Sequence, residues 1–506
     1  MARNGKIHDI ATLTAKLAEL RQARKVVHCH GVFDLLHVGH IRHLNQAKQL
    51  GDVLVVTITP DRYVNKGPDR PAFGEQLRAE ALAALDCVDY VAINDQPDAI
   101  ETIRRVRPHL FVKGSEFKEL KDHSGAVRQE AEAVASVGGQ IAFTDDITFS
   151  SSHLINRYLS SLDEPVRDYL DALARRHSAE SILGYLQAVD AKRVLVVGEA
   201  IVDEYHYCDA IGKSSKEPML AVKQQSIETF NGGILAVANH MAGFVDHVDV
   251  VSTVGADCPR ESFIRSHLSA NVAATFIHRA AAPTIVKRRF IDRYFFQKLF
   301  EVYEMNDQPV AGKEQQQLID AVDAAIGQAD LVVVVDFGHG VLTGPLTTRL
   351  AEQAEFLAVN TQSNAGNLGY HTISKYPRAD LICITEGELR LEARDRDGDL
   401  RPLVMAVADK LHARQVLITR GAHGCLAYSR DEGFADVPAL AGQVRDRMGA
   451  GDTFLAVSSL CALAGAPIEI VGLVGNAAGA QAVATVGHRQ PLQKHALFKH
   501  IECLLK

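Results

Sequence analysis

Short apolar strands alternate with helix-length segments in two separate blocks of this sequence, and no other feature constrains its fold so strongly. Strands are predicted at 25–29 and 53–58 in the first block, and at 193–198, 331–335 and 415–419 in the second. Strands separated in this way form βαβ units with a parallel sheet, which binds ligands at the carboxyl ends of its strands. Further elements of the first block are a helix at 40–50 and strands at 90–93, 110–112 and 140–143.

The length of the chain and a change of pattern between the blocks predict two domains. A single hydrophobic core stops growing near ~250–300 residues, and this chain has 506. Apolar residues recur at helical spacing between the blocks, which predicts a helical connector at 161–192 joining domains at 1–160 and 193–506. β-rich runs such as 284–290 predict a small sheet that projects from the second domain.

Composition excludes several classes of protein. With 54 basic and 62 acidic residues the net charge is −8, which argues against nucleic-acid binding. The 8 cysteines are scattered without a CxxC pair, as in proteins of a reducing compartment. No uninterrupted apolar run reaches ~18 residues, and residues 1–25 lack the core of a signal peptide. We therefore expect a cytoplasmic protein without a membrane partner.

The string Gly31-Val-Phe-Asp-Leu-Leu-His-Val-Gly-His40 follows the first strand and enters a helix. Imidazoles at His37 and His40 can donate to phosphate oxygens there, the helix start adds partial positive charge, and Gly39 lets a phosphate approach the backbone. A metal site is the alternative, but no third ligand is identifiable nearby, so we expect none. The neighbouring His28, His30 and His43 are interpreted as structural or solvated.

This string resembles the HxGH signature of the nucleotidyltransferase superfamily, which includes glycerol-3-phosphate cytidylyltransferase, over roughly residues 25–160. Other landmarks of that superfamily follow in order at Lys66-Gly67-Pro68, Glu75, Arg78 and Val112-Lys113-Gly114. The resemblance implies that His37 and His40 stabilise the transition state and that Lys66 holds phosphate. It implies a substrate contact by Arg70 and nucleotide contacts by Gly31, Phe33, Asp34, Gly39, Lys113, Ser150, Ser151 and Ser152.

The implied reaction is attack by a sugar-phosphate or polyol-phosphate oxygen on the α-phosphorus of a nucleoside triphosphate, with release of pyrophosphate. Catalysis then consists of positioning and charge neutralisation, without a protein nucleophile. Cytidylyltransferases of glycerol phosphate carry Arg-Thr-Glu-Gly before their closing motif, whereas Asp145-Asp-Ile-Thr148 stands here. The choice between ATP and CTP therefore stays open, with ATP favoured.

A second motif, Asp446-Arg-Met-Gly-Ala-Gly-Asp-Thr-Phe454, precedes a helix near the other end. Glycines before a helix present bare amides to an anion, and a carboxylate there can accept a proton from a hydroxyl. Alone, the string would fit a helix cap equally well. It resembles the DxxGAGD signature of the ribokinase (PfkB) family of sugar kinases, and this resemblance spans about 193–490.

The PfkB resemblance implies an αβα sandwich with a β-sheet lid that often forms a dimer interface. The expected fold class is therefore α/β, with a Rossmann-like nucleotidyltransferase domain followed by a ribokinase-like domain. The resemblance implies that Asp452 is the general base, that the amides of Gly449, Ala450 and Gly451 form an anion hole, and that Mg²⁺ bridges the ATP phosphates. It adds nucleotide-side residues Thr419, Gly421, Gly424 and Asn476, and sugar-side residues Asp203, Gly232 and Gly233.

Three positions depart from the PfkB pattern. Ala236 stands where an Asn usually follows the GG turn, Asn360-Thr-Gln362 replaces Asp-Pro-Lys, and Thr385-Glu-Gly-Glu388 replaces Asn-x-x-Glu. The base and anion hole are retained, while the sugar contacts and the metal surroundings have changed. Two interpretations follow: an active kinase with an unusual substrate, or a domain that binds a sugar or nucleotide without turnover.

Together the two resemblances are similar to the bifunctional heptose-phosphate kinase/adenylyltransferases, with the domain order reversed. They imply a homodimeric enzyme that phosphorylates a sugar or sugar phosphate and then activates a sugar or polyol phosphate with ATP or CTP. Such products serve surface polysaccharide or lipopolysaccharide synthesis. The alternative is an active nucleotidyltransferase with a sensing, non-catalytic kinase-like domain. An adenylyltransferase acting on a vitamin phosphate would share only the HxGH motif.

Overall fold

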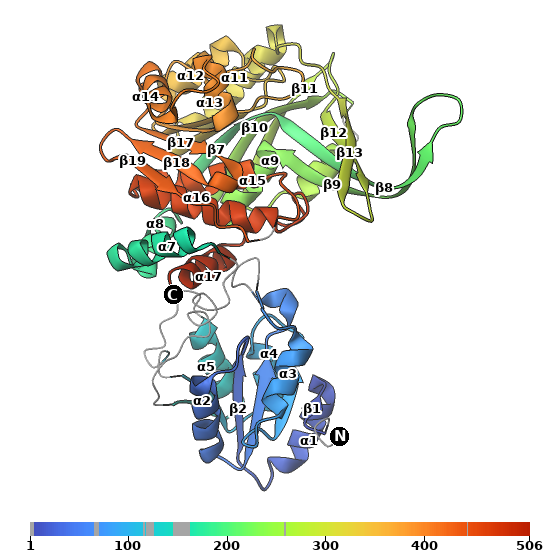
Figure 1. Cartoon of the computed structure of the whole chain (residues 1–506), viewed down its shortest axis with the longest axis vertical. Coiled ribbons are helices and arrows are strands. Elements are labelled where there is room, and N and C mark those ends of the chain that lie inside the picture. Colours follow the sequence, from blue (N-terminus) through green and yellow to red (C-terminus); the bar gives the residue numbers. More distant parts are fainter. Residues whose placement is uncertain are drawn as a thin grey trace. The chain divides into compact units, whose positions relative to one another are not determined.

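The computed structural model describes residues 5–64, 70–114, 117, 126–144, 162–257, 260–442 and 444–506 (Figure 1). The chain divides into two compact units, one of residues 1–163 with 498–506 and the other of residues 164–497. Helices α7 (Glu164–Arg176) and α8 (Ala179–Gln187) occupy the range where the connector is expected, and they belong to the second unit.

The first unit is built on a six-stranded sheet with the order β1-β4-β3-β2-β5-β6, and all its pairings are parallel. Its strands are β1 (Ile7–His8), β2 (Val26–Gly31), β3 (Val53–Ile58), β4 (Tyr90–Ile93), β5 (Leu110–Lys113) and β6 (Gln140–Phe143). Its helices include α1 (Ile10–Leu20), α2 (Val38–Gln49), α3 (Glu75–Ala83), α4 (Ile100–Val106) and α5 (Ala126–Ser136), with a 3₁₀ turn at Asp61–Tyr63.

The order of these strands reverses next to β2. The chain passes from β2 to β3 and β4 on one side, and then returns to β5 on the other. A crevice forms outside the carboxyl ends of parallel strands at such a switch point. The segment 31–40, which leaves β2 and enters α2, therefore begins at the place in this sheet where a ligand is expected.

The second unit contains a nine-stranded sheet with the order β11-β10-β7-β14-β15-β16-β17-β18-β19, parallel from β11 to β17 and antiparallel beyond. Its strands are β7 (Arg193–Gly198), β10 (His247–Gly255), β11 (Val272–Arg279), β14 (Leu331–Asp336), β15 (Leu357–Thr361), β16 (Leu381–Thr385), β17 (Gln415–Thr419), β18 (Cys425–Ser429) and β19 (Gly433–Val437). The remaining helices of this unit are α9 (Ile234–Ala242), α10 (Glu261–Ser266), α11 (Gly312–Ile326), α12 (Gly344–Gln353), α13 (Glu386–Ala393), α14 (Leu400–Lys410), α15 (Ala450–Leu463) and α16 (Ile468–Val483), with 3₁₀ turns at Ile373–Lys375 and Gly421–His423. Helix α17 (Lys494–Leu504) begins in this unit, and its residues from 498 onward belong to the first unit.

A separate four-stranded sheet, which we call the lid, projects from the second unit and confirms the small sheet predicted from the sequence. Its order is β13-β12-β8-β9. The strands are β8 (Ala200–Lys213), β9 (Leu220–Gly233), β12 (Ile285–Asp292) and β13 (Gln297–Glu304). Figure 1 shows the β8–β9 hairpin reaching well away from the nine-stranded sheet.

Helices α15 and α16 form part of the core of the second unit. Most of their residues are buried, 11 of 14 in α15 and 10 of 16 in α16, because both are apolar around most of their circumference. The start of α15 is thereby fixed in the interior beside the edge of the sheet. Of the helices that the structure describes, none has the length and apolar character needed to span a membrane.

Candidate active sites

Two histidines of the first unit lie side by side where β2 leads into α2. His37 is the N-cap of α2, with extended backbone (φ −134°, ψ 173°), and its Nδ1 accepts a hydrogen bond from the Gly39 amide at 3.1 Å. The His37 and His40 rings stack with their centroids 4.0 Å apart, and Phe33 packs against His40 at 5.2 Å. Because Nδ1 of His37 is an acceptor, the proton of the neutral ring lies on Nε2, which can donate to phosphate.

A buried carboxylate ties the segment 31–40 to the residues that follow β3. Asp34 accepts hydrogen bonds from Arg70 Nη1 at 3.3 Å and from the Phe73 amide at 3.1 Å. Arg78 is buried and donates to the carbonyls of Val32 and Thr59. Arg70 is thus held beside the predicted nucleotide site, whereas the hydrogen bonds of Arg78 fix the backbone around it.

Neighbouring histidines of the first unit occupy hydrogen-bonded positions, with His28 buried and His30 and His43 half-buried. His28 Nε2 and His30 Nδ1 both contact the Thr57 hydroxyl, at 2.7 and 2.8 Å, and His43 Nδ1 contacts Thr144 Oγ1 at 2.8 Å. Burial, with the charge of Lys113, lowers the pKa of His28 to about 3 and that of His43 to about 4. These rings are therefore neutral and contribute to packing.

Two of the predicted nucleotide-binding residues of the first unit, Gly31 and Lys113, lie at the carboxyl ends of neighbouring strands. Gly31 ends β2, and Lys113 ends the neighbouring β5. Lys113 Nζ forms an ion pair with Glu130 Oε2 at 2.7 Å. Lys66, Ser150, Ser151 and Ser152, also predicted here, lie outside the described residues.

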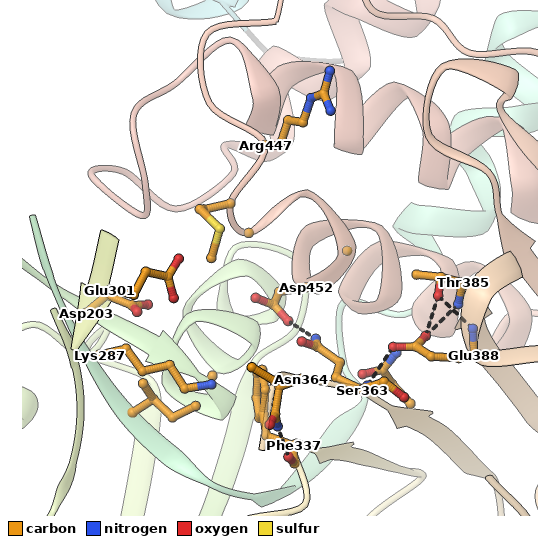
Figure 2. A pocket seen from close by; sticks show the side chains of 18 of the residues that line it. Asp203, Lys287, Glu301, Phe337, Ser363, Asn364, Thr385, Glu388, Arg447 and Asp452 are labelled. Atoms are coloured by element: carbon orange, nitrogen blue, oxygen red, sulfur yellow. Dashed lines mark hydrogen bonds between the residues drawn. The ribbon is translucent and has the colours of Figure 1, made fainter. Parts of the chain in front are cut away.

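The second unit holds a cavity of about 490 Å³ between the lid and the carboxyl edge of the large sheet. Figure 2 shows Asp452 near its centre, with Asp203, Lys287 and Glu301 on one side and Thr385 and Glu388 on the other. Its lining includes the sequence-predicted residues Asp203, Gly233, Thr419, Gly449, Gly451 and Asp452.

Asp452 lies in the first turn of α15, directly after the predicted anion hole. Gly449 is the N-cap, and its left-handed backbone (φ 77°) turns the chain into the helix. Asp452 Oδ1 accepts a hydrogen bond from Gln362 Nε2 at 3.2 Å. Burial raises the pKa of this carboxyl group, as is typical of carboxylates that exchange protons in active sites.

Basic residues from the lid line the side of the cavity next to Asp203. Arg289 donates to Asp203 Oδ1 and, through Nε, to Glu301 Oε1 at 3.3 Å. Lys287 is buried with its ammonium 4.8 Å from the centre of the Phe337 ring, and burial lowers its pKa. The sequence interpretation missed Lys287, Arg289 and Glu301. Lys287 and Arg289 alternate on the predicted strand 284–290 and so share one face, which was the available signal.

The opposite side of the cavity contains two of the departures from the PfkB pattern. Thr385 is the N-cap of α13, and its amide and hydroxyl donate to Glu388 Oε2 at 2.7 and 2.8 Å. Glu388 Oε1 accepts from the Ser363 amide at 2.9 Å. Asn360 Nδ2 donates to the Cys383 carbonyl at 2.7 Å. Thr385 therefore holds the Glu388 carboxylate at the cavity wall.

Some predicted residues lie away from this lining, as far as the described residues define it. Asn476 Nδ2 donates to the carbonyls of Val437 and Pro438, at 3.2 and 2.8 Å. Gly424 (φ 78°) packs against the Val437 carbonyl too closely for a side chain. Gly232 is equally confined by the Asp203 carboxylate. The remaining two positions are Gly421, in a 3₁₀ turn, and Ala450, the first residue of α15.

A buried carboxylate joins the anion-hole turn to the lid. Asp446 Oδ1 accepts from Lys298 Nζ of β13 at 2.7 Å and from the Met448 amide at 3.1 Å. Its Oδ2 accepts from the Tyr205 hydroxyl of β8 at 2.7 Å and from the Gly487 amide at 3.0 Å. The first residue of the DxxGAGD string thus has a structural role.

Two further buried carboxylates, Glu199 and Asp336, support the turn that contains Phe337, a residue of the cavity lining. Glu199 accepts from the amides of Phe337 and His339, at 2.9 and 3.1 Å. Burial and the neighbouring Asp336 raise the pKa of Glu199 to about 7. Asp336 is itself paired with Lys375 Nζ at 2.5 Å. These contacts fix the turn that presents Phe337 to the cavity.

Family models match both parts of the chain. Residues 191–495 match the model of the pfkB family of carbohydrate kinases, and residues 28–157 match the cytidylyltransferase-like family. Among solved structures, phosphofructokinase-2 from Escherichia coli in complex with potassium covers 61% of this chain and 99% of its own, at TM-score 0.50 and 18% identity. The same enzyme in complex with substrates and products gives TM-score 0.50 and 17% identity, over 61% of this chain and 98% of its own. This likeness shows a shared fold.

Curated relatives include bifunctional proteins HldE of several bacteria. That of Syntrophotalea carbinolica is 38% identical over 149 residues, which are 29% of this chain and 29% of that protein. That of Bradyrhizobium diazoefficiens is 27% identical over 305 residues, 60% of this chain and 61% of that protein. The chain thus spans less than a third of the first of these relatives and less than two thirds of the second.

Proposed function

Because this chain belongs to the pfkB family of carbohydrate kinases, we propose that its second unit transfers the γ-phosphoryl group of ATP to a hydroxyl of a sugar or sugar phosphate. The observation that carries this proposal is the position of Asp452. It lies in the first turn of α15, beside the turn at Gly449 and Gly451, and all three residues line one cavity. A buried carboxylate next to helix-start amides suits proton acceptance and anion binding.

The first unit is proposed to transfer a nucleotidyl group from ATP or CTP to a sugar or polyol phosphate, with release of pyrophosphate. Support comes from the stacked pair His37 and His40 at the switch point of the sheet and from the cytidylyltransferase-like match. The proton on His37 Nε2 would neutralise charge on the transferring phosphoryl group. Similarity to HldE proteins supports joining both activities in one pathway, which we propose leads to a lipopolysaccharide or surface polysaccharide precursor.

Magnesium would accompany ATP in the second unit. Among the described residues, no three His, Cys, Asp or Glu side chains gather as a metal cluster, and Mg²⁺ in kinases is held largely by substrate phosphates with one or two carboxylates. Glu388, fixed at the cavity wall by Thr385 and Ser363, fits the role of that carboxylate. Bound Mg²⁺ would screen the phosphate charges. Asn360 Oδ1 and Ser363 Oγ are buried without a hydrogen-bond partner among the described residues, and both side chains line the cavity.

A homodimer formed through the lid is also proposed. The lid exposes large apolar side chains, and a second copy is the partner implied by the family resemblance. Light scattering of the native chain, compared with a variant in which exposed apolar residues are replaced by Ser, tests this proposal. The residues concerned are Ile211, Met219, Leu220, Tyr294 and Phe295, which are 69%, 57%, 52%, 86% and 76% exposed.

Two assays test the proposed activities separately. Pyrophosphate release is measured from ATP and CTP with a panel of sugar 1-phosphates and polyol phosphates, and ADP release is measured with sugars and sugar phosphates. We expect His37→Ala/His40→Ala to abolish pyrophosphate release and to leave ADP release unchanged. We expect Asp452→Asn to abolish ADP release and to leave pyrophosphate release unchanged. If no acceptor yields ADP but a sugar phosphate raises the thermal stability of the second unit, the kinase proposal is wrong and the sensing alternative holds.

A further inference from the structure

A histidine on the loop after α16 lies beside Asp452, and no motif of the sequence assigns it a role. His488 lines the cavity, and its Nε2 is 3.8 Å from Asp452 Oδ2. Both side chains are about nine-tenths buried, with 9% and 11% exposed. This distance exceeds a hydrogen bond. Charges at this distance still attract in a poorly hydrated site, and catalytic contacts often shorten when substrate binds.

The same ring also packs against the anion-hole turn. A side chain on Gly449 would overlap the His488 imidazole, which therefore covers the backbone of that turn. Behind it, Thr453 Oγ1 contacts His240 Nε2 at 3.1 Å, and the His240 and His488 rings lie 5.9 Å apart. Burial lowers the pKa of His240 to about 3. His240 is therefore a neutral support, and His488 is the imidazole that faces the carboxylate.

The other charged groups around Asp452 come from several elements. Asp203 of β8 opposes ionisation of Asp452, while Lys287 of β12 favours it, and the amide of Gln362 after β15 donates to it. Asp446, which contacts the backbone of Gly487, is already paired with Lys298. Burial disfavours the ionised form of Asp452 that a general base requires. Of the groups facing Asp452, His488 does most to lower the pKa of this carboxyl group against the effect of burial.

We propose that His488 is a positioning residue of the kinase site: its imidazole faces the Asp452 carboxylate and favours the ionised form that a general base requires, and its ring holds the Gly449 turn. This inference rests on the kinase activity proposed above. In that reaction the proton of the acceptor hydroxyl passes to Asp452, and the hydroxyl oxygen bonds to the γ-phosphorus of ATP. The bond from that phosphorus to the bridging oxygen breaks, and ADP leaves with the electron pair. His488 forms and breaks no bond in this step.

The test compares His488→Gln with the native chain by two measurements. The first is the pH dependence of kcat/KM for ADP release with whichever sugar or sugar phosphate is turned over. The second is the titration of Asp452 itself, followed through ¹³Cγ-labelled aspartate and assigned as the resonance missing from Asp452→Asn. In His488→Gln we expect both the acidic limb and the Asp452 resonance to move to higher pH by about 0.5–1 unit.

The control is His278→Gln, which removes an imidazole that pairs with Glu261 at 2.8 Å and is not among the residues lining the cavity. His278→Gln should change neither the acidic limb of kcat/KM nor the titration of Asp452. An unchanged Asp452 titration in both His488→Gln and His488→Asn would overturn the inference, even if the chain is an active kinase. Absence of ADP release from the native chain would instead overturn the proposed function, while the carboxyl titration still decides the role of His488.

Discussion

Replacing Lys298 with Met should destabilise the second unit by about 2 kcal/mol. Asp446 is fully buried, so removal of the ammonium 2.7 Å away leaves a carboxylate in the interior. Breaking a buried pair costs about 3–5 kcal/mol when nothing else compensates. Here the Tyr205 hydroxyl and the amides of Met448 and Gly487 remain as donors. Lys298 is also 29% exposed, and both facts reduce the cost.

Urea unfolding followed by circular dichroism measures this loss, with Lys192→Met as the matched control. Lys192 pairs with Asp330 at a similar 2.8 Å, but the side chains are 43% and 33% exposed, so its loss should cost less than about 0.5 kcal/mol. Equal losses in the two variants, or none in Lys298→Met, would refute the argument that burial of Asp446 sets the cost.

The dependence of the Lys298→Met deficit on pH provides a second check. Burial alone would raise the pKa of Asp446, but Lys298, Tyr205 and two backbone amides outweigh it and hold this pKa below its ordinary value of 3.8. A carboxyl group whose pKa is lower in the folded chain stabilises the fold at pH values above its pKa in the unfolded chain. This stabilisation is lost as the pH falls through its pKa in the folded chain. The deficit should therefore be constant from about pH 5 to 8 and shrink below about pH 4.

Three further outcomes are expected. Gly449→Ala should lower ADP release at least about tenfold, because alanine is strained at φ 77° and its methyl group would overlap His488, while pyrophosphate release stays unchanged. Thr57→Val should cost about 1–3 kcal/mol in urea unfolding of the first unit, because it leaves buried His28 without its hydroxyl partner. Burial and Asp336 raise the pKa of Glu199 to about 7, so the stability that Glu199 contributes to the second unit should fall as pH rises from about 4.5 to 7. Calorimetry across that pH range should show that the melting temperature of Glu199→Gln depends less on pH than that of the native chain.

Local pattern was enough to predict much of the framework. The predicted strands at 53–58, 193–198 and 415–419 coincide with β3, β7 and β17. Each is a run of apolar and β-branched residues buried in a parallel sheet, so its composition alone marks it. The sequence interpretation missed α1 (Ile10–Leu20), although Ile10, Leu13 and Leu17 are buried at helical spacing.

The lid was predicted only as a set of β-rich runs, because its burial does not follow a simple alternation. Glu204 and His206 of β8 are buried, yet both are polar. Glu204 accepts from Arg260 at 2.5 Å and from Arg288 at 2.9 Å, residues 56 and 84 positions further along the chain. Such a cluster is stable only when the chain has brought all its members together, so no short window of sequence contains the signal.

The same limit explains why the sequence alone allows two interpretations of the altered motif positions. Thr385 stands where the family has Asn, and from sequence this suggested a changed metal shell. Thr385 nevertheless caps α13 and donates to Glu388 from both its amide and its hydroxyl. The substitution therefore preserves the position of the carboxylate, because a hydroxyl at an N-cap can bond the third residue of the helix as an amide side chain would.

The opposite wall of the cavity has a different chemical character. Lys287, Arg289 and Glu301 all come from the lid. Arg289 forms an ion pair with Asp203, the residue expected to bind sugar hydroxyls, and also donates to Glu301. An acceptor must therefore either displace Arg289 from that carboxylate or bind to the pair as it stands. The groups proposed for phosphoryl transfer can remain in place in both cases, because Asp452 is fixed by α15 and Glu388 by α13. In the proposed reaction, selection of the acceptor would thus depend on the lid, while the chemistry would depend on two helix starts packed against the large sheet. Substitutions at Arg289 should accordingly change which sugar is used before they change the rate constant for transfer.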